Sequence, residues 1–136
     1  MAKGQGPKAP ARQWYMRDWL TDPNLSQCRP ETRGVWMDLL AHMHLADGSG
    51  VLRGTVDQLA RMARCTVEEM GRSLRELSST KTAHVTPCNK NVLESNSVVT
   101  VKNRRMMREH KEREQTRLRV QRHRKKRGCN GQDTLF

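Results

Sequence analysis

The residues that most constrain the fold lie between 55 and 77, where the pattern predicts two short helices joined by a tight turn. Thr66 and Glu69 have the spacing of a capping box, in which a hydroxyl and a carboxylate each accept a hydrogen bond from an otherwise unpaired backbone amide. The apolar residues beyond Thr66 recur at intervals of three and four, as on the buried face of a helix: Val67, Met70, Leu74 and Leu77. We therefore predict helices over 56–63, capped by Thr55, and over 66–77. They form either a helix-turn-helix or a helical hairpin of no particular function.

Two segments of strand composition follow these helices and favour the first alternative. They are His84-Val85-Thr86 and Val98-Val99-Thr100-Val101, and the residues between them are polar. We expect a hairpin with strands near 83–87 and 97–102 and a wing over about 87–97. The predicted fold class is α+β: mainly α with a small β-hairpin, a winged helix-turn-helix with a basic, partly disordered C-terminal helix or tail.

The segment before residue 55 supplies the rest of the expected core. Pro30 suits the first turn of a helix, and the apolar residues after it have helical spacing, with Trp36 buried beside Leu59, Met70 and Leu74. Gly34 would weaken this helix unless a close contact requires it. Val51-Leu52 reads as a short extended piece. The aromatic residues Trp14, Tyr15 and Trp19 favour packing onto the core, with base stacking as the alternative.

Positive charge is concentrated near the C-terminal end. Residues 102–127 contain 13 of the 26 Lys and Arg residues and three acids, which leaves a net charge of 13 − 3 = +10 out of the formal +12. Clustered cations displace the counterions of nucleic acid, so a polymer of phosphates is the favoured partner; a solvated basic tail is the plain alternative.

The same patterns divide the chain into three parts. Residues 1–12 are rich in Gly, Pro and Lys without an apolar run, and we expect a disordered arm, not a signal peptide. Residues 13–110 form the expected winged-helix domain, and residues 111–136 form a basic tail. Asn103 is a suitable cap for a last helix through Met107, with fraying or disorder beyond His110, where the pattern is polar on all faces.

At this point the sequence resembles the N-terminal winged-helix domain of phage and prophage replication proteins of the replisome-organiser type. The resemblance covers about residues 13–110 and is carried by the order and spacing of five short segments: residues 14–20, WYMRDWL; residues 33–40, RGVWMDLL; residues 58–63, QLARMA; residues 67–70, VEEM; and residues 99–106, VTVKNRRM. Arg64 stands where such domains usually have Gly in the turn, and Arg29 stands where a Ser or Thr cap is usual.

The resemblance implies binding to duplex DNA near a replication origin and a host replication helicase or its loader as a protein partner. It also implies a bacterial cytoplasm as the location, with the protein on the nucleoid when bound. The sequence ends at Phe136 without the second domain that many such proteins use to engage partners, so we do not expect helicase recruitment by this chain alone. A homodimer is a further expected assembly.

The expected DNA contacts are basic residues, with the wing and the tail contributing more affinity than the second helix of the helix-turn-helix, whose first turn carries Glu68 and Glu69. These contacts are Arg72, Arg75, Lys90, Lys102, Arg104, Arg105, Arg108, Lys111, Arg113, Arg117, Arg119, Arg122, Arg124, Lys125, Lys126 and Arg127.

Other functions are less well supported by the sequence. No catalytic motif or phosphate-binding loop is present, the four cysteines stand far apart, and we expect no enzyme activity, metal or cofactor. A transcriptional regulator of the same fold, an RNA-binding protein and a protein-protein adaptor remain as alternatives.

Overall fold

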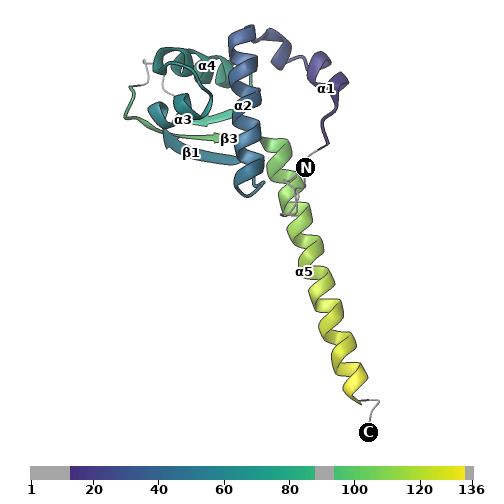
Figure 1. Ribbon diagram of the computed structural model, residues 1–136. Helices are drawn as coiled ribbons and strands as arrows, with labels where there is room; N and C mark the ends of the chain where they lie inside the picture. The colour runs from purple at the N-terminus through teal and green to yellow at the C-terminus, as the bar shows by residue number, and fades with distance from the viewer. Residues whose placement is uncertain (1–12, 88–93, 134–136) are drawn as a thin grey trace, which may run out of the picture.

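The computed structural model describes residues 13–87 and 94–133, in which helices predominate over a small sheet (Figure 1). The elements, in order, are α1 (Met16–Thr21), the 3-10 helix η1 (Leu25–Gln27), α2 (Pro30–Ala46), β1 (Val51–Thr55), α3 (Val56–Met62), α4 (Val67–Ser79), β2 (His84–Thr86), β3 (Val98–Lys102) and α5 (Arg104–Asp133). The predicted α+β class, mainly helical with a small β-hairpin, is confirmed. The expected arm over 1–12, Lys90 and the tip of the expected wing lie outside the described residues.

Helices α3 and α4 begin and end close to the predicted positions because their caps are local. The Glu69 amide donates to the Thr66 hydroxyl over 3.1 Å, and the Thr66 amide donates to the Glu69 carboxylate over 3.0 Å. Thr55 and Gln58 form a second capping box at the start of α3. The turn between the helices passes through Arg64, whose φ of 58° lies in the left-handed region that favours glycine. Its guanidinium donates to both carboxylate oxygens of Asp38 over 3.0 Å, which holds the turn against α2.

The predicted hairpin is present and belongs to a three-stranded antiparallel sheet with the order β1-β3-β2. In the register of this sheet, Val101 lies opposite Leu52 on one side and opposite Val85 on the other. The extended piece predicted at Val51-Leu52 is therefore the first part of β1, which is an edge strand of the sheet.

The core lies between this sheet and helices α2, α3 and α4. Trp36, Leu59, Met70 and Leu74 are all buried in one cluster, as predicted. The side chains of β3 alternate, and its two buried valines complete the floor of the core.

Two predictions about the N-terminal half are wrong. Trp14 and Tyr15 are 52% and 48% exposed, because the six-residue helix α1 packs against the core through Trp19 alone. Gly34 is also exposed, and a Cβ atom there would meet nothing within 4 Å. No close contact explains this glycine; the buried residues on the other side of α2 stabilise the helix despite it.

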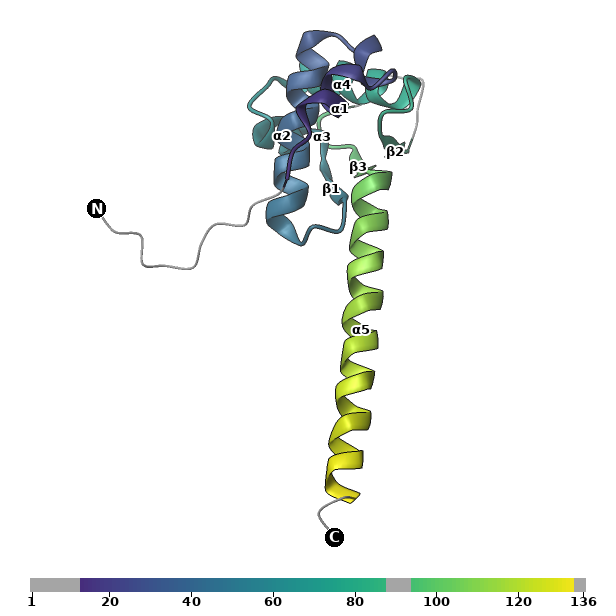
Figure 2. The ribbon, with the colours of Figure 1, turned by 90° about the vertical axis from the view of Figure 1, so that its right-hand side faces the viewer.

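Helix α5 is much longer than the predicted final helix. Asn103 caps it as expected, since its side-chain oxygen accepts from the amides of Arg105 and Met106 over 3.0 and 3.3 Å. The helix then continues to Asp133 and projects away from the domain (Figures 1 and 2), where fraying beyond His110 was expected. Most of its residues are strong helix formers, and ion pairs one turn apart support it, including Arg117 with Glu114 at 2.9 Å.

Candidate nucleic-acid interface

A stripe of basic side chains runs along one face of α5. At 3.6 residues per turn, positions 104, 108, 111, 119, 122 and 126 fall within about a quarter of a turn of one another, and position 115 between them is Gln. We call this set the α5 stripe: Arg104, Arg108, Lys111, Arg119, Arg122 and Lys126. All six residues are exposed. With a rise of 1.5 Å per residue, the stripe is roughly 33 Å long.

The α5 stripe faces away from the domain. The side of α5 that contacts the domain carries Met106, which is buried, and Arg113, which donates to the Gly48 carbonyl over 3.4 Å. Both lie about half a turn from the centre of the stripe. The cations of the stripe are therefore turned toward solvent along their whole length.

The acids of α5 leave the stripe uncompensated. Glu109 pairs with Arg105 at 3.2 Å, and Glu114 pairs with Arg117, so the described ion pairs of this helix use cations outside the stripe. Glu112 lies at the edge of the stripe. Within the described part of the chain, none of the six stripe side chains forms an ion pair, and the resulting surface is strongly positive, with Glu112 at its edge.

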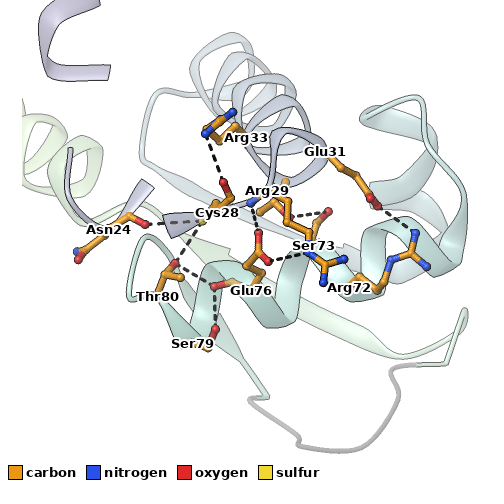
Figure 3. A network of polar contacts seen from close by, with 11 residues as sticks. Asn24, Cys28, Arg29, Glu31, Arg33, Arg72, Ser73, Glu76, Ser79 and Thr80 are labelled. Atoms are coloured by element: carbon orange, nitrogen blue, oxygen red, sulfur yellow. Dashed lines mark hydrogen bonds and ion pairs between the residues drawn. The ribbon is translucent and has the colours of Figure 1, made fainter. Parts of the chain in front are cut away.

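The basic residues of α4 make contacts within the domain. Arg72 pairs with Glu31 of α2 at 3.2 Å (Figure 3). Arg75 donates from Nε to the carbonyl of Gly71 over 3.3 Å. Arg29 and Glu76 form a further ion pair between α4 and the start of α2, and the Arg29 amide donates to the same carboxylate. Glu76 thus accepts from the backbone amide of the residue that precedes α2, whereas no side chain caps the first-turn amides of this helix.

The first turn of α4 is acidic as well. The hydrogen bond from the Thr66 amide, together with a weaker one from the Thr66 side chain, lowers the pKa of the Glu69 carboxyl below its usual value. Glu69 is therefore ionised at neutral pH, next to the exposed Glu68. Phosphates would be repelled here, which leaves α5 as the more attractive surface.

The structure brings most of the predicted DNA contacts together on one element. Twelve of the sixteen lie on α5, two lie on α4, Lys102 is half-buried at the end of β3, and Lys90 is outside the described residues. Sequence reasoning identified the basic residues but missed their arrangement in a stripe. The i, i+4, i+7 spacing of positions 104, 108 and 111, repeated from 119 in the order i, i+3, i+7, was the available signal.

No family model, curated protein or solved structure matches the chain. Among the helices described, none is both long and apolar enough to cross a membrane. Within residues 13–87 and 94–133, no group of three or more His, Cys, Asp or Glu side chains is placed to hold a metal ion.

Proposed function

We propose that this chain is a DNA-binding protein of the winged-helix type that binds duplex DNA mainly through phosphate contacts made by the α5 stripe. The observation that carries the proposal is six exposed cations on one face of a projecting helix, with a single acid, Glu112, at the edge of that face. Such a surface neutralises phosphates along a duplex and releases their counterions. The order helix, turn, helix, hairpin in α3, α4, β2 and β3 supports the winged-helix assignment.

The role in phage or prophage replication, in the bacterial cytoplasm, rests on the resemblance of residues 13–110 to replisome-organiser domains. Selection of bound sequences from phage and host DNA tests it. Clustered repeats near an origin would support replication, whereas a palindrome in the promoter of this gene would indicate a regulator of transcription. Competition between duplex DNA and hairpin RNA separates a DNA-binding function from an RNA-binding one.

Two matched triple substitutions test the α5 stripe itself. The first replaces three stripe cations by glutamine: Arg119→Gln, Arg122→Gln and Lys126→Gln. The control replaces two arginines and one lysine of the same helix outside the stripe: Arg124→Gln, Lys125→Gln and Arg127→Gln. Both variants lose three charges, so net charge alone predicts equal effects.

We expect the stripe variant to weaken duplex binding and to reduce the slope of log affinity against log salt by about 2.7, from 0.9 for each lost phosphate contact. The control should change the slope much less. Equal losses in the two variants would show that only total charge matters, and unchanged binding in both would contradict the proposal.

A further inference from the structure

Helix α1 and the residues before it expose an unusual amount of apolar surface. Trp14 and Tyr15 are about half exposed, and Met16 and Leu20 are 66% and 74% exposed. Large aromatic rings are usually buried or bound to something in a small domain, because each carries a large apolar area. The Tyr15 ring lies where the start of α1 meets the first turn of α5.

The rings are held in place by contacts on both sides. Trp14 packs on Trp19 with ring centroids 6.0 Å apart and an interplanar angle of 57°, and Trp19 in turn packs against the core. The Arg105 guanidinium lies over the Tyr15 ring, 5.7 Å from its centroid. Arg105 also pairs with Asp18 of α1 at 3.6 Å, so α1 is fastened to the first turn of α5.

This arrangement places the Tyr15 ring beside the first turn of α5, the turn in which the α5 stripe begins. Arg104, the first stripe residue, directly precedes Arg105, the residue that contacts Tyr15. Unpaired bases stack on exposed aromatic rings, and cations nearby bind the phosphates that connect those bases. We propose that Trp14 and Tyr15, with the adjoining cations of α5, form a binding site for single-stranded nucleic acid.

Paired bases cannot use this site, because their faces are already stacked inside the duplex. The site would therefore add to the proposed binding of duplex DNA a second activity, directed at an unpaired segment. It stands on the contacts of α1 with Arg105 and does not depend on duplex binding by the distal part of α5. The two activities can be removed separately.

A protein partner is the competing occupant of the same surface. Such a partner would use Met16 and Leu20, which lie one turn apart on α1 and are more exposed than the rings. The basic helix that begins beside the rings favours a polyanion that also carries aromatic groups. Substitutions at Trp14 and at Leu20 distinguish the two occupants.

Tryptophan fluorescence of the full chain reports on the site directly. Two of the three tryptophans, Trp14 and Trp19, belong to the cluster, whereas Trp36 is buried in the core. Titration with oligothymidylate should quench the emission, because a base stacks on Trp14. An abasic oligonucleotide of equal length and charge should bind more weakly and quench little. Equal binding and equal quenching by the two would overturn the proposal.

Substitutions complete the test, with duplex binding measured in parallel. Trp14→Ala should lower the affinity for oligothymidylate about five- to a hundredfold, and Trp14→Phe should restore most of it, since a ring is retained. Both variants should keep the melting temperature and the duplex affinity of the parent chain. Leu20→Ala is the control and should bind oligothymidylate normally. Loss of binding in the Leu20 variant, or normal binding by Trp14→Ala, would overturn the site. Oligouridylate in place of oligothymidylate then tells RNA from DNA as the preferred strand.

Discussion

The core leucine of α4 illustrates how strongly single residues determine stability. Leu74 has no exposed surface and lies in the cluster that contains Trp36, Leu59 and Met70. Leu74→Ala should lower the free energy of unfolding by about 2–5 kcal/mol, because it removes buried methyl groups and leaves a cavity. Chemical denaturation followed by circular dichroism measures the change. Arg75→Ala, at the next and exposed position, is the control and should change stability by less than about 0.5 kcal/mol. An unaltered transition in the leucine variant would contradict the assigned packing.

The capping box of α4 predicts a dependence of stability on pH. Hydrogen bonds from Thr66 lower the pKa of Glu69 from its usual value of 4.5 in the folded protein. A carboxyl whose folded pKa is lowered contributes stability above its usual pKa and loses that contribution as the pH falls through the folded value. Glu69→Gln keeps an acceptor but has no charge. The parent chain should therefore be more stable than this variant at neutral pH, and the difference should shrink below about pH 4.5. A constant difference between pH 3 and pH 7 would refute the role of the ionised carboxylate.

Residues whose structure depends on near neighbours could be predicted from the sequence, and residues that depend on distant contacts could not. Thr66 and Glu69 are three positions apart, and their hydrogen bonds need only the helix that they begin. Trp14 and Tyr15 were expected in the core, but their burial would need a partner that α1 does not reach. Arg64 adopts the left-handed conformation that favours glycine because the turn requires it and Asp38 holds its side chain.

At the scale of elements, helix α5 was the most difficult to predict. The sequence beyond His110 lacks an apolar face, and most helices in proteins gain their stability from packing such a face. The residues are nevertheless good helix formers, and charged pairs one turn apart add to local stability. The α5 stripe could be read from the sequence only once the helix was known to be continuous, because one break would rotate the second half relative to the first.

The continuity of α5 can be tested without removing a charge. Gln115 lies in the middle of the α5 stripe, and Gln115→Pro would delete one backbone hydrogen bond and disfavour the helix by about 3 kcal/mol. We expect less helical circular dichroism, an unchanged melting temperature for the domain and weaker binding to duplex DNA. Gln115→Ala should preserve the helix and the affinity. If the proline variant loses helix yet binds duplex DNA as well as the alanine variant, duplex binding does not require the stripe cations to lie on one face of a continuous helix.

At the scale of the whole molecule, the chain separates packing from charge. The residues that form the core lie within 13–110. The α5 stripe begins near the end of this range, at Arg104, and continues beyond it. The net charge of +10 carried by residues 102–127 leaves +2 for all other residues together. This division predicts that the basic helix α5 determines the affinity for duplex DNA, while the folded domain determines how α5 is oriented.

Deletion of residues 111–136 tests this division. The deletion removes four of the six stripe cations, and the large apolar side chains among the described residues of the deleted segment, Leu118 and Val120, are exposed. The remaining domain should therefore keep its melting temperature. With six phosphates neutralised, the full chain should show a slope of roughly −5 for log affinity against log salt, and two remaining contacts should give roughly −2, from 0.9 per phosphate. The loss should be similar for all duplex sequences, since phosphate contacts do not read bases. Equal slopes before and after deletion would mean that α5 is a solvated helix and that duplex binding, if present, belongs to the domain.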